Sequence, residues 1–336
     1  MRIALDAMGS DAHPGPEVEA AVELTRQHGA GLTLIGDGPR LQQMLGSRAA
    51  GIEVVHAPDV FEMSDHISLS ALRRAKSSMG IGLDLVKGGK ADAFVTAGNT
   101  GGAMATALSR LGRINGVLRP ALTVLFPVKG GRCVALDIGA NAECKPEWLL
   151  QFGLMGSAYA EKVLGINNPR VGLISNGEEA GKGSDLVKEA FPLLATSSLN
   201  FRGNIEGKEL FGGEVDVVVM DGFTGNVLMK GAEAVAKLIS DRLRAELTAT
   251  WRTKIGALLA RPALKNLRKD LDPREVGAAT LLGVNGLVFV AHGRSDATAM
   301  VNAVKLARHS VEVGLLSSLR TAIEQGLSQL APEGAA

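Results

Sequence analysis

The sequence predicts an α/β fold: an open, mostly parallel sheet with helices on both faces. Three observations support this prediction. Short runs rich in Val, Ile, Leu and Ala alternate with longer segments of helical period along the 336 residues. The short runs are apolar on both faces, as strands covered by helices on each side must be. Gly is frequent, with 42 residues, and many glycines stand where an expected strand passes into an expected helix.

The expected elements follow this alternation in chain order, with right-handed connections between parallel strands. The strands are short runs of mainly apolar residues: 2–6, 32–36, 53–56, 93–96, 134–137, 171–175, 215–220 and 287–291. The helices are longer segments with a helical period: 16–28, 68–79, 102–111, 147–164, 184–194, 226 to about 250, and 295–313. We expect one α/β domain over residues 1–330, including a protruding helical tip at 237–271, and a disordered tail at 331–336.

Composition excludes several classes of protein. The chain carries 36 Lys and Arg against 35 Asp and Glu, which argues against a globally basic nucleic-acid binder. Aromatic residues make up 4% of the chain, too few for base-stacking platforms. Cys133 and Cys144 are too few for a disulfide scaffold and are expected to be buried free thiols. With no signal peptide and no apolar run long enough to span a bilayer, we expect a cytoplasmic protein.

Five expected strands run into loops that combine Gly with Asn or Asp and then into a helix. These loops are residues 5–11, 96–102, 136–141, 175–183 and 220–226. Any one of them alone is typical of a plain turn with a helix N-cap. Because the carboxyl ends of parallel strands share one edge of an open sheet, we expect all five to converge there in a ligand crevice.

The residue types in these loops suit a phosphate or an oxyanion. Gly permits close approach of the backbone, Asn and Thr offer neutral hydrogen bonds, and helix N-termini add free N–H groups and a positive dipole end. Lys182, between Gly181 and Gly183, is the one cation within the loops. It could act as a point charge on the anion, and a solvated loop lysine is the equal alternative.

Other kinds of active site lack their motifs. No P-loop and no Gly-x-Gly-x-x-Gly motif is present, which disfavours ATP and NAD. No nucleophile elbow and no histidine or cysteine spacing for a metal is found, so we expect no metal and no cofactor. His292 either borders the site or belongs to a turn. If the nucleophile is itself a substrate, the protein has mainly to position it and to stabilise an oxyanion.

The chain resembles bacterial phosphate acyltransferase, the acyl carrier protein:phosphate transacylase family of phospholipid synthesis, from Met1 to about Val313. The blocks that carry the resemblance are 4–11 (ALDAMGSD), 97–102 (AGNTGG), 136–144 (LDIGANAEC), 176–183 (NGEEAGKG), 201–207 (FRGNIEG), 217–230 (VVVMDGFTGNVLMK) and 277–293 (GAATLLGVNGLVFVAHG). Ser10 and Gly102 are small departures from the family pattern. A regulatory phosphate-binding protein and, by fold analogy alone, a decarboxylating dehydrogenase are the alternatives.

The resemblance implies reversible transfer of a fatty acyl group from acyl carrier protein to inorganic phosphate, by direct attack of phosphate on the thioester. It implies a homodimer with a fold similar to the isocitrate and isopropylmalate dehydrogenases. The acyl phosphate would pass to a membrane glycerol-3-phosphate acyltransferase for phosphatidic acid synthesis. The expected partners are therefore acyl carrier protein, phosphate and that membrane enzyme, with no nucleic acid.

We expect Lys182 and Asn226 to be the catalytic residues, Lys182 neutralising phosphate or the oxyanion and Asn226 donating to the oxyanion. Three aspartates that close strands would orient the loops or move protons, with a structural Asx turn as the equal alternative. The phosphate-binding and substrate-binding residues that we expect are Asp6, Gly9, Asn99, Thr100, Gly101, Asp137, Asn141, Asn176, Asp221, Thr224 and Gly225.

The expected tip is strongly basic. Residues 237–269 hold nine basic and two acidic side chains, a net charge of +7, which leaves −6 for the rest of a chain whose total is +1. Apolar residues recur there at near-helical spacing, and Pro262 divides the segment into two amphipathic pieces. Such a tip suits an acidic protein or an anionic membrane surface, with a dimer-packing helix pair as the alternative. The expected contact residues are Arg242, Arg244, Trp251, Lys254, Leu258 and Leu259.

Overall fold

The computed structural model describes residues 1–28, 31–61 and 76–330. It contains one sheet whose strands are Arg2–Asp6 (β1), Gly31–Gly36 (β2), Ile52–His56 (β3), Ala93–Thr96 (β4), Ala121–Val128 (β5), Gly131–Leu136 (β6), Arg170–Ile174 (β7), Asn200–Ile205 (β8), Val217–Val219 (β9), Ala278–Leu282 (β10) and Leu287–Ala291 (β11). Their order across the sheet is β3-β2-β1-β4-β11-β10-β5-β6-β9-β7-β8.

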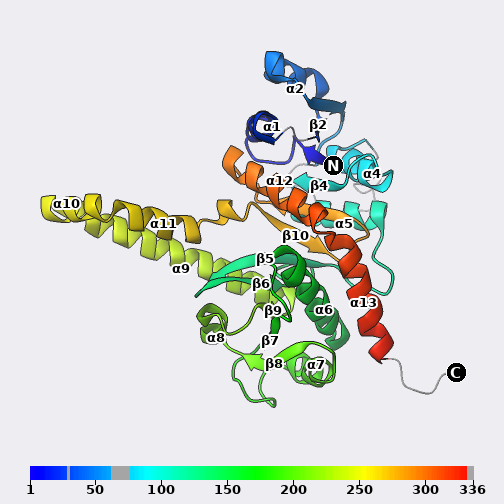
Figure 1. The fold of residues 1–336 in the computed structure, drawn as a ribbon, viewed down its shortest axis with the longest axis vertical. Coiled ribbons are helices and arrows are strands. Elements are labelled where there is room, and N and C mark those ends of the chain that lie inside the picture. Colours follow the sequence, from blue (N-terminus) through cyan, green and yellow to red (C-terminus); the bar gives the residue numbers. More distant parts are fainter. Residues whose placement is uncertain (29–30, 62–75, 331–336) are drawn as a thin grey trace.

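The sheet is covered on both faces (Figure 1). The helices are Gly15–His28 (α1), Gly38–Leu45 (α2), Ser78–Lys87 (α4), Thr100–Leu111 (α5), Pro146–Val163 (α6), Asp185–Ala195 (α7), Gly207–Gly212 (α8), Gly222–Ala249 (α9), Trp251–Leu259 (α10), Arg261–Leu271 (α11), Ala297–Glu312 (α12) and Leu315–Leu330 (α13). One core cluster joins the sheet to α1, α2, α6, α7, α12 and α13. A second joins its other face to α4, α5 and α8, with the start of α9 packed against it. The predicted α/β class is confirmed.

The sheet consists of two parallel groups that run in opposite directions. Strands β3, β2, β1, β4 and β11 form one group, and β6, β9, β7 and β8 form the other. Between them β10 is antiparallel to both β11 and β5, and β5 is antiparallel to β6. The expectation that five loops share one edge is therefore wrong, because the strand direction reverses in the middle of the sheet.

All eight expected strands are present, with boundaries shifted by a few residues. Three further strands, β5, β8 and β10, were not expected from the sequence, nor were α2, α8 and α13. The expected helix at 68–79 lies mostly outside the described residues, and the helix that follows begins at Ser78. The expected tail at 331–336 also lies outside them.

Three helices form an arm that extends away from the sheet (Figure 1). Helix α9 has 28 residues, or about 42 Å of helix, and α10 and α11 return alongside it. Thr250 follows the last residue of α9 and caps α10. Pro262 is the second residue of α11, so it lies where the sequence predicts a break between two amphipathic pieces. The arm carries exposed apolar side chains, of which Leu259 is 78% exposed. No helix among the described residues is long and apolar enough to cross a bilayer.

The packing of α6 on the sheet yields a stability prediction. A Cβ atom at Gly156 would lie 2.6 Å from Val217 and 2.8 Å from Leu136. Gly156→Ala should therefore lower the free energy of unfolding by about 1–3 kcal/mol through overpacking. Gly256→Ala, in α10 with open space around it, is the matched control and should raise it by up to about 1 kcal/mol. Urea unfolding measures both, and equal stability of Gly156→Ala and the unchanged chain would contradict the packing.

Candidate active site

One cleft lies over the central strands β11, β10 and β5 and has a volume of about 520 Å³. Loops from both parallel groups reach it. Its lining includes Asp11 after β1, Gly98 and Thr100 after β4, Ile138 and Gly139 after β6, Asn226 and Lys230 on α9, and His292 and Gly293 after β11. Four of the five expected loops therefore meet here, although they come from opposite directions.

The loops after β1 and β4 are held by a buried carboxylate. Asp6 accepts hydrogen bonds from the N–H of Met8 (3.0 Å) and from Oγ1 of Thr96 (2.7 Å). Thr96 Oγ1 in turn accepts from the N–H of Gly98 (3.0 Å). A Cβ at Gly9 would lie 2.6 Å from the nitrogen of Gly98, so the two backbones touch only because residue 9 is Gly. Burial raises the pKa of Asp6 above its ordinary value.

A second buried carboxylate organises the loop after β6. Asp137 accepts from the N–H groups of Leu122, Gly139, Ala140 and Asn141 at 2.7–3.2 Å, and from Nδ2 of Asn141 at 2.9 Å. Asn141 Nδ2 also donates to the carbonyl of Pro120. Burial raises the pKa of Asp137 as well, against the lowering effect of these donors. Asn141 thus helps to hold this loop in place through its hydrogen bonds to Asp137 and Pro120.

The start of α9 packs directly on this loop. A Cβ at Gly225 would lie 1.9 Å from the carbonyl oxygen of Asp137, and one at Gly222 would lie 2.6 Å from the carbonyl oxygen of Asn141. Asp221 caps the helix by accepting from the N–H and the Oγ1 of Thr224. Asp6, Asp137 and Asp221 thus all accept hydrogen bonds from nearby loop or cap groups, as an orienting or Asx-turn role requires, and their part in the reaction stays a prediction.

Two helices begin beside the cleft. Asn99 caps α5 by accepting from the N–H of Gly102 (2.9 Å), and Thr100, the first residue of α5, lines the cleft. Gly101 lines a small adjoining cavity of about 100 Å³ that shares Thr100 with the cleft. The amino end of a helix favours anions because its first N–H groups lack helical partners.

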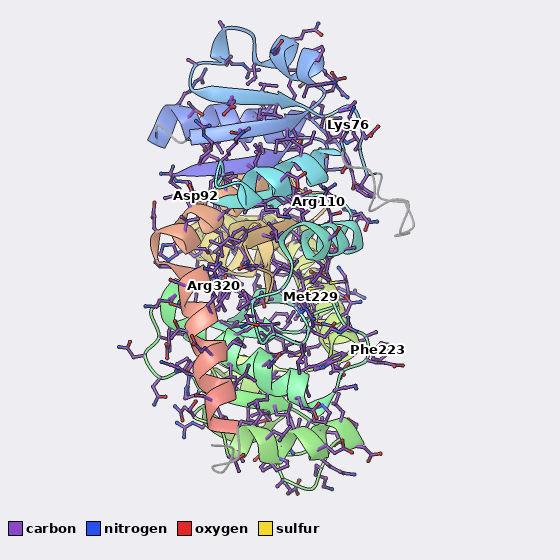
Figure 2. All side chains as sticks on the ribbon, turned by 90° about the vertical axis from the view of Figure 1, so that its right-hand side faces the viewer. Lys76, Asp92, Arg110, Phe223, Met229 and Arg320 are labelled. Atoms are coloured by element: carbon purple, nitrogen blue, oxygen red, sulfur yellow. The ribbon has the colours of Figure 1, made fainter. Side chains whose placement is uncertain are left out.

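Helix α9 contributes one face to the cleft. Asn226, Met229, Lys230 and Glu233 line it, and Figure 2 shows Met229 towards the middle of the molecule, with Phe223 at its margin. Lys230 Nζ pairs with Glu233 at 3.2 Å. The sequence prediction missed all but Asn226, yet their spacing of three, four and seven residues from Asn226 is the signal that would have found them.

His292 both borders the cleft and belongs to a turn. It is exposed, and its Nδ1 accepts from the N–H of Arg294 (3.1 Å), which leaves the proton of a neutral ring on Nε2. Neither Ser nor Cys lines the cleft within the described chain. Cys133 is a buried free thiol as predicted, whereas Cys144 is free but only half-buried, and burial raises the pKa of Cys133 and that of Cys144 to about 12.

The loop after β7 lies away from the cleft. Lys182 and Asn176 are exposed there and are absent from the lining. This loop is held by its own hydrogen bonds: the N–H of Lys182 and Nδ2 of Asn204 both donate to the carbonyl of Glu179. The expected convergence of this fifth loop is wrong for the single chain, because β9 separates β7 from β6. The catalytic role of Lys182 stays a prediction.

The Asp6–Thr96–Gly98 bridge can be tested with two isosteric changes. Thr96→Val leaves a buried carboxylate oxygen and a buried N–H without their partner, so we expect a loss of about 2–4 kcal/mol in unfolding free energy. Thr123→Val is the control, because the Thr123 hydroxyl is buried without a hydrogen-bond partner among the described residues. It should leave stability unchanged or higher. Denaturant unfolding of both variants measures the difference, and equal effects would exclude the bridge.

Comparison with known proteins places the chain in a family. Residues 1–317 match the model of the family described as "Fatty acid synthesis protein". The chain is 47% identical over 326 residues to a phosphate acyltransferase of Pelotomaculum thermopropionicum, covering 96% of this chain and 95% of the relative. It is 44% identical over 329 residues to a phosphate acyltransferase of Elusimicrobium minutum, covering 97% and 96% of the two chains.

Solved structures share the fold at low identity. A phosphotransacetylase from Streptococcus pyogenes has a TM-score of 0.60 at 16% identity, covering 96% of this chain and 94% of its own. A putative 4-hydroxythreonine-4-phosphate dehydrogenase from Salmonella typhimurium has a TM-score of 0.54 at 14% identity, covering 92% and 98%. Together with the sequence matches over nearly the whole chain, these findings show that the protein belongs to the phosphate acyltransferase family.

Proposed function

We propose that this acyltransferase moves a fatty acyl group from the thioester of acyl carrier protein to inorganic phosphate, reversibly, and so supplies acyl phosphate for phosphatidic acid synthesis. The observation that carries the proposal is the make-up of the cleft. Backbone loops, a helix start, the exposed amide of Asn226 and Lys230 line it, whereas Ser and Cys do not within the described chain. Such a lining suits a reaction in which phosphate is the nucleophile.

The reaction then needs no acyl-enzyme. A phosphate oxygen attacks the thioester carbonyl, and the carbonyl electrons form an oxyanion to which Asn226 donates. The carbon–sulfur bond breaks as the oxyanion collapses, a carbon–oxygen bond to phosphate remains, and the carrier thiol leaves with a proton that the attacking phosphate gave up. We propose that Lys230, whose Nζ pairs with Glu233 at 3.2 Å, exchanges this partner for the phosphate, and Lys182 remains a second predicted cation.

The arm is the proposed contact for the partners. Its basic residues suit the acidic carrier protein, and its exposed apolar residues suit an anionic membrane, where a glycerol-3-phosphate acyltransferase would take the product. Arg242, Arg244 and Lys254 are exposed along α9 and α10, and Trp251 and Leu258 are 68% and 66% exposed. We propose a cytoplasmic homodimer that touches the membrane peripherally through this arm.

Asn226 gives the sharpest test of the chemistry. Asn226→Ala removes the amide that donates to the oxyanion, so turnover should fall by about 10²–10³. Acyl carrier protein thioester is incubated with phosphate, and acyl phosphate is trapped with hydroxylamine as the hydroxamate. Asn167→Ala, on an exposed loop outside the cleft, is the control and should keep full turnover.

Two results of this assay would count against the proposal. If the unchanged chain forms no phosphate-dependent hydroxamate, the transacylase function is wrong and the regulatory phosphate-binding function is favoured. If Asn226→Ala keeps near full turnover, Asn226 does not take part in the reaction. Lys182→Ala in the same assay decides whether that lysine takes part, with a large loss of turnover expected from the sequence prediction.

Substitutions on the arm can distinguish membrane binding from binding of acyl carrier protein. Replacing Leu258 and Leu259 by Asp should weaken sedimentation with vesicles rich in phosphatidylglycerol by about tenfold or more, because about two buried apolar side chains are lost, while soluble activity persists. Replacing Arg242, Arg244 and Lys254 by Ala should instead raise the KM for acyl carrier protein. Lys162→Ala, exposed on the body at the end of α6, is the charge control. Unchanged vesicle binding and unchanged KM would leave the arm a structural element only.

A further inference from the structure

A side cavity of about 450 Å³ adjoins the cleft between α9, residues 271–277, the loop after β11 and the start of α12. Glu233 and His292 are among the residues that line both the cleft and the side cavity. We propose that the side cavity binds the phosphate of the phosphopantetheine tether, the flexible group that carries the acyl thioester on acyl carrier protein. Its donors are Arg294, Ser295 and Lys237. This inference rests on the proposed acyl transfer.

The loop after β11 brings polar groups to the side cavity that the fold leaves unbonded. Ser295 is 8% exposed and lines this cavity, yet its hydroxyl has no hydrogen-bond partner among the described residues. Arg294 also lines the cavity, and its exposed guanidinium has no partner in the same part of the chain. A nearly buried hydroxyl that no protein group satisfies, next to an unpaired cation, is available to bind the oxygens of an anion.

Helix α9 supplies a second cation from another wall of the side cavity. Lys237 lines the cavity, and its Nζ pairs with Asp241 at 2.9 Å. Both side chains of this pair are mostly exposed, at 76% and 63%. An exposed ion pair within one helix contributes little to stability, so Lys237 can exchange Asp241 for a phosphate at small cost.

Two carboxylates also line the side cavity. Asp272 is bound by Arg274 at 2.6 Å, and Arg274 pairs with Asp296 at 2.9 Å as well. Glu233 stands where the side cavity meets the cleft, because it lines both. The lining as a whole has three cationic side chains against two carboxylates. A small positive excess of this kind suits the single negative charge of a phosphate diester, which is the form that the tether has on the carrier.

The position of the side cavity fits the length of the tether. Lys237 lies eleven positions after Asn226 on α9, or about 16 Å along the helix. About thirteen bonds separate the sulfur from the phosphorus of the tether, and they span about 15 Å when extended as a backbone is. A phosphate beside Lys237 can therefore belong to a thioester whose carbonyl lies near Asn226. A free phosphate held beside Lys237 would be too far away to attack that carbonyl.

The side cavity also lies towards the surface on which the carrier is proposed to dock. Arg244, one of the expected contacts for acyl carrier protein, is exposed seven positions after Lys237. Residues seven apart lie on the same face of a helix. A carrier docked at Arg244 would thus bring the phosphate end of its tether to the side cavity and the thioester end to the cleft.

The test removes the phosphate from the substrate and its donors from the protein. The palmitoyl thioesters of phosphopantetheine and of pantetheine differ only in that phosphate, and neither carries a protein that docks elsewhere. Hydroxamate trapping, with inorganic phosphate as the acceptor, gives kcat/KM for each thioester. The unchanged chain should prefer the phosphopantetheine thioester by about tenfold or more, as one charge-assisted hydrogen bond provides. Arg294→Ala and Lys237→Ala should each lower this preference several-fold.

Matched variants control for the loss of charge and of a hydroxyl. Arg26→Ala and Lys305→Ala, exposed on α1 and α12 and outside the side cavity, should keep the preference of the unchanged chain. Ser295→Ala should lower the preference several-fold. Ser310→Ala should not, although the Ser310 hydroxyl is also buried without a partner among the described residues, because Ser310 does not line the side cavity.

The KM for inorganic phosphate distinguishes the two sources of a phosphate group. If Arg294→Ala raises this KM and leaves the preference between the two thioesters unchanged, the side cavity binds free phosphate and the inference fails. If neither the preference nor this KM changes, the side cavity binds no phosphate group, and the inference fails as well. No hydroxamate from any thioester, that of acyl carrier protein included, overturns the proposed function itself.

A second measurement reads binding without turnover, so it decides the inference even if the small thioesters do not react. Phosphopantetheine and pantetheine are titrated into the protein, and the heat of binding is recorded. Phosphopantetheine should bind about tenfold or more tightly than pantetheine, and Arg294→Ala should lower this ratio several-fold. Equal binding of the two compounds, binding of neither, or a ratio that Arg294→Ala leaves unchanged would overturn the inference.

Discussion

Two buried carboxylates fix the loops on which the cleft depends. Asp137 is fully buried and collects five N–H donors, and Asp6, with 1% exposure, accepts from Met8 and Thr96. A carboxylate taken out of water without such partners costs several kcal/mol, so few loop conformations are compatible with the folded core. The loops after β1, β4 and β6 are therefore held by the fold itself, through hydrogen bonds to these two carboxylates. The proposed stabilisation of an oxyanion would benefit from such donors, because donors already in place need no reorganisation during a reaction.

Because strand direction reverses within the sheet, loops reach the cleft from two opposite sides. Strands β10 and β5 lie between the parallel groups, so the loops that Asp6 organises and those that Asp137 organises come from opposite ends of the sheet. Each group supplies a helix start, α5 from one and α9 from the other. A substrate between them meets positive helix ends from two directions, which a single parallel sheet would not provide. The opposed loops also leave the face of the central strands uncovered between them, where the cleft lies.

Much of this arrangement was predictable from the sequence, and the missing parts have identifiable causes. The apolar runs revealed the parallel strands, and the Gly and Asn patterns revealed four of the loops that meet. The reversal was missed, although Lys129 and Gly130 form a two-residue connection between β5 and β6, too short for a crossover and typical of a hairpin. Lys182 could not be placed, because pattern alone does not say that β9 stands between β7 and β6. Lys230 and Glu233 were missed because they lie on a helix face beyond the five loops on which the prediction was based.

Helix α9 ties the reaction to the surface where partners would dock. Its first turn packs on the Asp137 loop through Gly222 and Gly225, and its next turns line the cleft. Its last turns stand clear of the body, where Leu238 is 58% exposed. An exposed apolar stripe of this extent favours a covering partner, since isolated helices gain most of their stability from packing. Because α9 is continuous from Gly222 to Ala249, a contact made on the arm and Asn226 belong to the same helix. A partner docked on the arm, as proposed, would therefore sit on the same helix that lines the cleft.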